Sequence, residues 1–370
     1  MKEEKTICDY IGSLELGKVQ KYRNMAVVPL IRRGSKSELE YKVLHEAIDD
    51  GSFRIKEANA YGTVNNLTAF VESDEPILII KGEYVVGGKQ NRMITVNALI
   101  DQDAGKINIP VHCVEHHRWN YGKYDEEFKS PEIMSASLRG EISKCFSGSV
   151  GQSATWNAVA CHLNRAGVSS GTQDFGKIYE DRRHDIREYA KAFDYVPGQV
   201  GFVAAIEDDD GRVHQFIDVF DKAQTLSKHG DRILNSYAVD ALASRSNEIN
   251  FKRADAEKFI ENLKDSNMDV SDSLSLGKDV EISKTLGKTE RKDRLHYSPV
   301  SKEMLKERIT GSGLVYKSNV VYIGAKQGIE AFPKKWIGIP EMPPIRFPPR
   351  DPFIRPLGNN EGNDSWHWRR

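Results

Sequence analysis

The sequence has few cysteines, and their spacing excludes the common cysteine-based scaffolds. The 370 residues include four cysteines, Cys8, Cys113, Cys145 and Cys161. None forms a Cys-x-x-Cys pair or stands at a zinc-finger interval from a histidine. We therefore expect free thiols, as in a reducing cytoplasm, and neither a structural metal nor a cofactor.

Long hydrophobic runs are also missing. The best apolar runs, Pro76–Ile80 and Val200–Ile206, have strand length, whereas roughly 18–20 apolar residues are needed to span a bilayer. The amino terminus is charged from its second residue and has no apolar stretch of roughly 7–15 residues, which a secretory signal needs. These absences predict a cytoplasmic protein that neither enters nor crosses a membrane.

The chain also lacks an excess of charge of one sign and the common catalytic motifs. The chain has 53 basic and 54 acidic residues, a formal net charge of -1. Nucleic acid is therefore a possible partner that the charge does not support. No Walker loop, G-x-S-x-G elbow, H-E-x-x-H helix or G-x-G-x-x-G turn occurs. The sequence alone thus indicates no particular reaction.

What is present predicts an α+β fold with two lobes and a tail. Hydrophobic residues make up 39% and charged residues 29% of the chain, which is ordinary for a globular protein. Residues 1–120 are β-rich and predict an antiparallel sheet or sandwich. The expected elements are a strand at 25–31, a helix at 38–50, and strands at 53–57, 64–71, 76–84, 90–100 and 109–115.

Residues 121–332 form the expected mixed α/β lobe. Apolar spacing predicts helices at 152–166, 174–193, 231–244 and 255–265, and hairpins at 200–220 and 314–325. Residues 265–303 are polar and weakly patterned, so we expect a mobile insertion within them. Eight of the fourteen prolines lie in the tail, residues 333–370, which predicts a disordered segment.

The stretch from Lys81 to Arg92 is the most informative for chemistry. Its paired glycines, Gly87 and Gly88, permit positive φ and a close backbone approach. Lys89, Gln90, Asn91 and Arg92 follow and supply donors of the kind that hold phosphate, carboxylate or ribose. The alternative is a hairpin turn with solvated polar residues.

A second cluster, His112 to Trp119, closes the β-rich half. Cys113, Glu115 and His116 could bind a metal, or Cys113 could act as a nucleophile, but neighbouring histidines point to opposite faces of a strand. We favour Glu115 paired with Arg118 and covered by Trp119. The acidic run Glu207–Asp210 lacks the spacing of a calcium loop, so a hairpin tip is expected there.

Together with their surroundings, the two clusters resemble a prokaryotic family, the ADP-ribosylglycohydrolase- and rhodanese/phosphatase-associated protein domain. The resemblance covers roughly residues 10–330. It rests on the Gly-Gly-Lys-Gln-Asn-Arg string at 87–92, the Cys-Val-Glu-x-x-Arg-Trp string at 113–119, and segments such as Val28–Leu30 and Gly313–Tyr322. It implies a setting in nucleotide or ADP-ribose chemistry and supplies no catalytic residue.

Two functions follow as hypotheses, and the oligomeric state stays open. The first is a binding module in which the Gly87–Arg92 turn, with Arg118 and Trp119, recognises an anionic ligand such as ADP-ribose, a nucleotide or an RNA end. The second is a hydrolase or transferase with Glu83 or Glu115 as general base. We predict that the Gly87–Arg92 and Glu115–Trp119 segments converge on one side of the first lobe and form the functional pocket, because buried charges need partners. The alternative is a structural network in which Glu83 or Glu115 pairs with Arg92 or Arg118.

Overall fold

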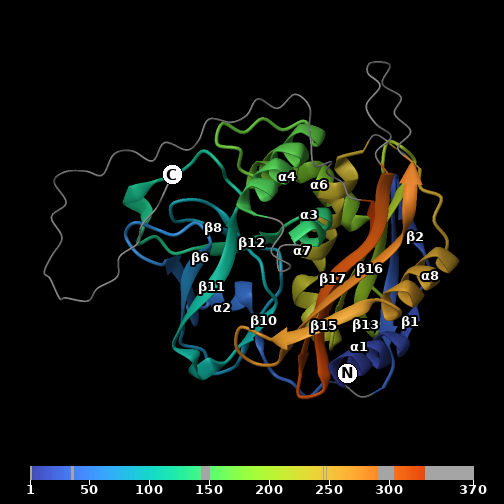
Figure 1. Cartoon of the computed structure of the whole chain (residues 1–370), viewed down its shortest axis with the longest axis horizontal. Helices are drawn as coiled ribbons and strands as arrows, with labels where there is room; N and C mark the ends of the chain where they lie inside the picture. The colour runs from blue at the N-terminus through green and yellow to red at the C-terminus, as the bar shows by residue number, and fades with distance from the viewer. Residues whose placement is uncertain are drawn as a thin grey trace, which may run out of the picture. The chain divides into compact units, whose positions relative to one another are not determined.

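The computed structural model describes residues 2–34, 37–142, 151–244, 246, 248–290 and 304–329, all within one compact unit, Met1–Phe332. Its largest sheet is nine-stranded and antiparallel, and combines strands from residues 14–32 with strands from residues 199–220 and 267–329 (Figure 1). The path runs through β1 (Leu14–Leu16), β3 (Met25–Arg32), β13 (Gln199–Glu207), β14 (Val213–Phe220), β18 (Asn319–Ile329), β17 (Met304–Tyr316), β16 (Lys278–Glu290) and β15 (Asn267–Asp272), and β2 (Gln20–Tyr22) pairs with β3.

Alternate side chains of the central strands enter two different cores, as the pleat requires. On β3, Met25 and Val27 belong to one hydrophobic cluster, whereas Ala26 and Val28 belong to the other. Both faces of this sheet are therefore covered, which explains why β13 is buried over nearly its whole length.

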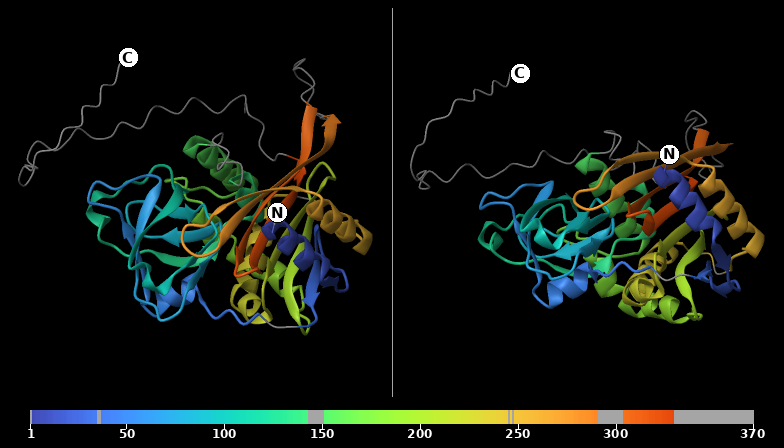
Figure 2. Two further views of the ribbon diagram at one scale, coloured as in Figure 1. Left: turned by 60° about the horizontal axis from the view of Figure 1, so that its bottom comes forward. Right: turned by 90° about the horizontal axis from the view of Figure 1, so that it is seen from below.

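Helices supply the two covers (Figure 2). The core on one face includes residues of α1 (Lys2–Gly12) and α8 (Arg253–Lys264). The core on the other includes residues of α3 (Ala136–Ile142), α4 (Gln152–Arg165), α5 (Gly176–Asp181), α6 (Arg183–Lys191) and α7 (Ala223–Leu242). No helix in the described ranges combines the length and the apolar character needed to cross a membrane.

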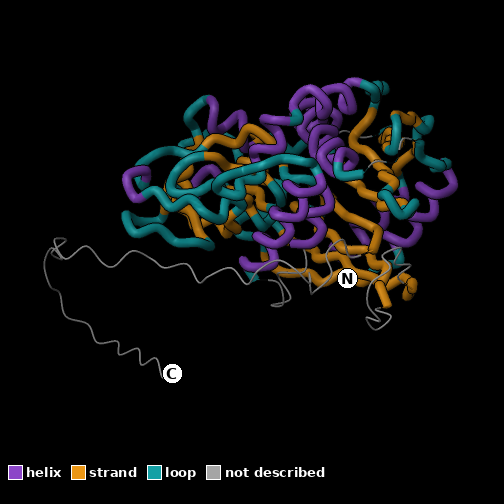
Figure 3. Tube along the Cα trace, turned by 90° about the horizontal axis from the view of Figure 1, so that it is seen from above, coloured by secondary structure: helices purple, strands orange, loops and turns teal. Residues whose placement is uncertain are grey.

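Residues 42–133 build two smaller sheets with their own core, in a region made mainly of strands and loops (Figure 3). The six-stranded sheet has the order β12 (Lys129–Ile133), β8 (Glu83–Val86), β9 (Arg92–Ile94), β11 (Lys106–Cys113), β6 (Asn66–Val71), β5 (Phe53–Glu57). The three-stranded sheet has the order β10 (Ala98–Ile100), β7 (Ile77–Ile79), β4 (Lys42–Val43). The same region contains α2 (Leu44–Asp49) and the 3-10 turns η1 (Gln102–Ala104) and η2 (Tyr121–Lys123).

The expected α+β class and antiparallel sheets are confirmed. So is the hairpin at 200–220, whose acidic run lies at the tip between β13 and β14. The division into lobes near residue 120 stays a prediction, and the proline-rich tail, residues 333–370, lies outside the described residues.

Two predicted elements are each divided in two: the strand expected at 90–100 forms β9 and β10, which lie in different sheets, and the helix expected at 174–193 forms α5 and α6. Three further elements differ from the sequence prediction. Residues 267–290, expected within a mobile insertion, form β15 and β16; exposed polar side chains on the edge strand β15 had hidden its pairing with β16. The rest of that insertion, residues 291–303, lies outside the described residues. The strand expected at 76–84 breaks at Gly82 (φ 97°).

The helix expected at 38–50 is the third difference, because it forms over Leu44–Asp49 alone. The residues before it are held in extended structure by tertiary contacts. Lys42 and Val43 pair in parallel with β7, and the Tyr41 hydroxyl lies 2.6 Å from Thr225 Oγ1 in the core. Local helical spacing is overridden there by long-range pairing.

Candidate functional site

The Gly87–Arg92 turn has the backbone that its glycines predicted. Gly87 and Gly88 adopt φ angles of 144° and 48°. A Cβ on Gly88 would lie 2.5 Å from the Phe128 ring and 2.9 Å from Glu57 Oε1, so the backbone approaches its neighbours too closely for a side chain. The turn is therefore packed against Phe128 and Glu57 and is not free in solvent.

The two segments converge as predicted, whereas their role as the functional pocket stays a prediction. Arg118 Nη1 donates to the Gly88 carbonyl at 2.9 Å, and its Nε donates to Glu115 Oε2 at 2.7 Å. Gln90 Nε2 donates to the Glu115 carbonyl at 2.9 Å. The Glu115–Arg118 pair expected from sequence thus forms, and it binds one segment to the other.

Asn91 is the centre of this polar network. Its Oδ1 accepts from Arg118 Nη2 at 2.9 Å and from the Gly87 amide at 3.2 Å. Its Nδ2 donates to the Tyr84 hydroxyl at 2.9 Å and to Asp174 Oδ2 at 3.0 Å. All four hydrogen-bonding positions of the amide are occupied, which fixes its orientation.

Lys89 and Arg92 have fully buried side chains, unlike the solvent-facing heads that a simple anion turn would present. Arg118 is one quarter exposed, at 24%, but its donors are occupied by the network. Trp119 lies over the cationic ends of both Lys89 and Arg92.

Glu83 lies apart from this network. Its carboxylate is fully buried and accepts from Arg232 Nη2 at 2.6 Å and from Ser130 Oγ at 2.8 Å. Arg232 Nη1 also lies 3.0 Å from His45 Nδ1. Glu83 and Glu115 each form an ion pair with an arginine, which accounts for their burial. The geometry around these two carboxylates therefore does not favour a general base.

Cys113 is not an activated nucleophile. Its Sγ donates to Gln90 Oε1 at 2.7 Å, and burial raises the pKa of the thiol to about 12. Cys8, Cys113 and Cys161 are free, as expected; Cys145 lies outside the described residues.

A cavity of about 430 Å³ opens beside Asn91, within the range of roughly 300–1,000 Å³ typical of ligand sites. Its walls come from β8, β12, α5, α6 and α7. The polar residues that line it are Tyr84, Asn91, Glu132, Asp174, Tyr179, Glu180, Arg183, Arg187 and Asn235. Lys89, Gln90, Arg92, Arg118 and Trp119 are not among its lining residues.

Two carboxyl groups in this cavity are perturbed. Burial raises the pKa of Asp174, and the nearby Glu115 charge adds to that effect. Asp174 is held by the Tyr84 hydroxyl and the Gly176 amide, at 2.9 and 3.0 Å from its Oδ1. Burial also raises the pKa of Glu132, although a hydrogen bond from Asn235 opposes the shift.

Two arginines complete the cavity. Arg183 and Arg187 are one helical turn apart on α6 and exposed. Neither forms an ion pair with any residue that the structure describes. The cavity therefore combines two exposed cations, which form no ion pair within the described residues, with two carboxyl groups whose pKa values are raised by burial; the charges of Arg183 and Arg187 oppose that rise at Glu132.

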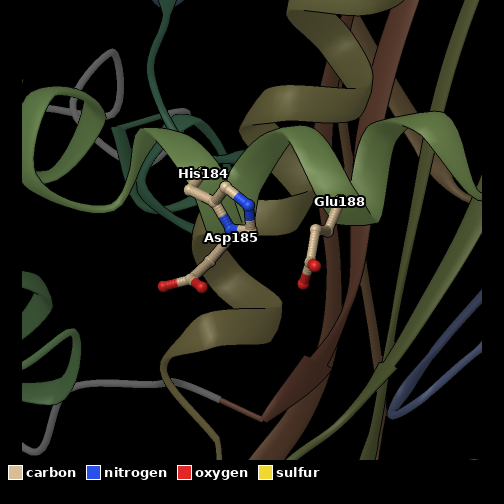
Figure 4. Close-up of side chains that lie close together, drawn as sticks. All are labelled: His184, Asp185 and Glu188. Carbon is tan, nitrogen blue, oxygen red and sulfur yellow. The ribbon is translucent and has the colours of Figure 1, made fainter.

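The helix α6 also carries a group of potential metal ligands, His184, Asp185 and Glu188 (Figure 4), whose ligand atoms lie within 4.8 Å of one another. Asp185 is bound by Arg182 Nε at 2.6 Å, and Glu188 lies 3.5 Å from Arg23. These partners account for both carboxylates. Cys113, Glu115 and His116 form no such group in the described part of the chain.

A second cavity, of about 220 Å³, is lined by Ser137, His162 and Asp240 among others. These residues do not form a catalytic triad, because Ser137 Oγ and Asp240 Oδ1 both lie against the same nitrogen, His162 Nε2, at 3.0 and 3.3 Å. Asp240 Oδ2 accepts from the Ser137 amide at 2.8 Å, at the start of α3. The arrangement is that of a helix cap.

Asp174, Glu132, Arg183 and Arg187 were missed at the sequence level. The charge-rich segment 174–193 predicted a solvated helix face, and its arginine spacing alone does not reveal a facing strand. The available signal was Asn91, which the local chemistry of the turn identified; its partner Asp174 is brought there by a bridge between Glu115 and Asp174 that pairs segments distant in sequence.

Comparison with known proteins gives a family and nothing more specific. Neither the curated proteins nor the solved structures contain a significant match. Residues 13–325 match the ARG and Rhodanese-Phosphatase-superfamily-associated Protein domain, which covers well over half of the chain. With the Gly87–Arg92 and Glu115–Trp119 segments joined as described, the chain belongs to the ARG and Rhodanese-Phosphatase-superfamily-associated Protein domain family.

Proposed function

We propose that this chain is a binding module for a small anionic ligand of the ADP-ribose or nucleotide class, held in the cavity beside Asn91. The observation that carries the proposal is the presence of two arginines, Arg183 and Arg187, on the wall of a cavity of about 430 Å³, where neither forms an ion pair with a described residue. Guanidinium groups bind phosphate and carboxylate through two parallel hydrogen bonds. The family name, with its link to ADP-ribosylglycohydrolases, and an expected cytoplasmic, prokaryotic setting agree with such a ligand.

The carboxyl side of the cavity suits the remainder of such a ligand. Asp174 and Glu132 have raised pKa values, with burial as the main cause in both. Protonated carboxyl groups donate hydrogen bonds and do not repel an anion, and ionised ones accept from ribose hydroxyls. Asn91 holds Asp174 in place, so the sequence-predicted turn supports the site through Asn91 while Lys89 and Arg92 lie outside it.

The test is ligand-dependent thermal stability of the full chain, because a ligand that binds only the native state raises the melting temperature. ADP-ribose, ADP and inorganic phosphate are the probes. We expect the Arg183→Ala/Arg187→Ala variant to lose at least about tenfold in affinity for whichever probe binds, about 1.4 kcal/mol.

A matched control removes two cations elsewhere. Arg253 and Lys258 are exposed on α8 and do not line the cavity. Arg253→Ala/Lys258→Ala changes the net charge by the same amount and should leave affinity unchanged. Equal loss in both double variants would mean that general electrostatics, and not this cavity, attracts the probe.

Catalysis is a second candidate, favoured by one observation. Asp174 lines the cavity, is oriented by Tyr84, Asn91 and Gly176, and has a pKa raised by burial, as general acid–base groups do. In this hydrolase or transferase hypothesis Asp174 takes the role first expected of Glu83 or Glu115. Recovery of ADP-ribose and ADP unchanged after prolonged incubation would leave binding as the function; turnover lost in Asp174→Asn but kept in Glu83→Gln would establish catalysis.

A further inference from the structure

Arg92 is a fully buried cation whose guanidinium uses only some of its hydrogen-bond donors. Its side chain is 0% exposed. Nη1 donates to Gln90 Oε1 at 3.1 Å, whereas Nε and Nη2 have no hydrogen-bond partner among the described residues. Nε–H and Nη2–H are the parallel pair of a guanidinium, the edge that binds a carboxylate or a phosphate with two hydrogen bonds. The unused donors are therefore a ready oxyanion-binding edge.

The charges around Arg92 are unbalanced. Lys89 is also fully buried, and burial lowers the pKa of its amine, with the Arg92 charge acting in the same direction. The acid closest to both is Glu57, whose Oε1 accepts from the Lys89 amide at 2.9 Å and lies 3.8 Å from Arg92 Nη2. That distance is too long for a hydrogen bond. The Lys89 ammonium donates to the Ala60 carbonyl and not to Glu57. One carboxylate therefore balances two buried cations without a hydrogen bond to either cationic group within the described residues.

An aromatic cover lies over these cations. The Trp119 ring is 5.4 Å from Lys89 Nζ and 5.7 Å from Arg92 Cζ, and the Tyr121 ring is 4.9 Å from Lys89 Nζ. Trp119 Nε1 is buried and, within the described ranges, unpartnered. Residues 120–127, which continue from Trp119, are exposed throughout. The Asn120 amide donates to the Lys89 carbonyl at 3.2 Å, and Asp125 and Glu127 lie 3.1 and 3.6 Å from Lys56 Nζ. Exposed ion pairs of this kind contribute little stability, so the cover is weakly held.

We propose that Trp119 and residues 120–127 cover a second anion site, in which the Nε–Nη2 edge of Arg92 binds the oxygens of phosphate or of a phosphate group, with Lys89 as the second cation. While the site is empty, cation–π contacts with Trp119 and Tyr121 stabilise the charges of Arg92 and Lys89. Because an arginine cannot lose its charge in a protein, it gains most from an anion that supplies the missing acceptors. The site goes beyond the cavity at Arg183 and Arg187, which lies against Asn91 and does not include Arg92.

Glu57 separates this proposal from a purely structural cluster. In an anion site its carboxylate competes with the ligand for Arg92, so Glu57→Gln should bind phosphate at least threefold more tightly than the native chain. In a structural cluster the same substitution would remove the counter-ion and gain no affinity. Arg92→Lys keeps the charge but removes the parallel edge, and should weaken phosphate binding at least tenfold.

The experiment is titration of the full chain with inorganic phosphate, followed by tryptophan fluorescence, with Trp119→Phe to identify the signal from the cover. We expect saturable binding, the Glu57→Gln gain, and no effect of Arg183→Ala/Arg187→Ala on this signal. A parallel ADP-ribose titration tells whether a ligand's phosphate group uses the same site. The proposal is overturned if phosphate leaves the Trp119 signal unchanged in both the native chain and Glu57→Gln, or if Glu57→Gln binds no more tightly. Both outcomes are readable even where Arg92→Lys does not fold, and neither depends on the cavity at Arg183.

Discussion

Arg139 and Arg92 are both buried arginines, but they differ in how many of their hydrogen-bond donors have partners. Arg139 donates through Nη1 to Asp218 Oδ1 at 2.7 Å, through Nη2 to Asp218 Oδ2 at 3.0 Å, and through Nε to the Met134 carbonyl at 3.1 Å. Asp218 in turn accepts from the Tyr237 and Tyr322 hydroxyls. Within the described ranges, Arg92 has a single side-chain hydrogen bond, from Nη1 to Gln90 Oε1.

The difference indicates two uses for a buried charge. The Arg139–Asp218 cluster lies between the nine-stranded sheet and α3 and α7, and the cavity beside it, about 20 Å³, holds little more than one water. Saturated hydrogen bonding of that kind fixes the packing of elements distant in sequence. The Arg92 cluster lies in the small sheets beneath an exposed segment, where unsaturated donors favour a ligand over a structural role.

The largest expected effect is on stability when each arginine is replaced. Arg139→Met should destabilise the chain by about 3–5 kcal/mol, because it leaves Asp218 charged and buried without a cationic partner. Arg92→Met should cost clearly less, about 1–2 kcal/mol, because it removes one hydrogen bond and one loose ion pair. Urea unfolding of both variants measures the two losses. Equal losses would break the comparison and make Arg92 a structural residue.

The second effect sharpens the account of the turn. Gly88→Ala places a Cβ against Phe128 and Glu57 at a φ of 48°, so we expect a loss of about 2–4 kcal/mol. Gly105→Ala is the matched control, since Gly105 has a φ of 61° but no neighbour within 4 Å of an added Cβ. It should lose about 1 kcal/mol, the conformational part alone. Similar losses in denaturant unfolding would mean that close approach at Gly88 contributes little.

The third effect concerns the fully occupied amide between the two clusters. Asn91→Ala leaves Arg118, Tyr84 and Asp174 each short of one hydrogen bond, so a loss of about 1–3 kcal/mol is expected. Ligand affinity at the cavity should fall as well, because Asp174 is no longer held. Asn108→Ala, at an exposed asparagine of β11, should change stability by less than about 0.5 kcal/mol. If the Asn91→Ala chain is as stable as this control, the Asn91 amide is not the centre of the network.

Local chemistry predicted the glycine turn, the Glu115–Arg118 pair and Asn91, because these depend on backbone freedom and on residues close in sequence. It could not predict the Arg139–Asp218 pair, whose members are joined by tertiary packing. The same packing breaks the strand expected at 76–84: a Cβ on Gly82 would lie 2.1 Å from the Arg139 side chain, so the chain turns there with a positive φ. Nor could the amphipathic spacing of α6 show that Arg183 and Arg187 face a cavity.

The smallest expected effect concerns a second buried side chain without hydrogen-bond partners, His229, where we infer no ligand. His229 is also fully buried, stacked on Phe220 at 5.2 Å, and neither ring nitrogen has a hydrogen-bond partner among the described residues. Unlike arginine, histidine can stay neutral: burial, reinforced by the Arg232 charge, holds the pKa of His229 well below its usual range. The unfolded chain therefore binds a proton that the folded chain does not, and stability should fall as pH drops below about 6.5, by about 1.4 kcal/mol per pH unit from this group.

Urea unfolding between about pH 5 and 6.5 measures that slope. His229→Phe, which keeps an aromatic ring against Phe220, should reduce it by the full contribution of one histidine. Burial raises the pKa of Asp174 and of Glu132, so protonation of these two groups stabilises the folded chain on acidification and opposes the slope in both chains. The difference between the native chain and His229→Phe isolates His229. If that difference is zero, His229 is charged or hydrogen-bonded in the folded chain, and an unpartnered buried nitrogen is no longer a guide to a missing ligand at Arg92.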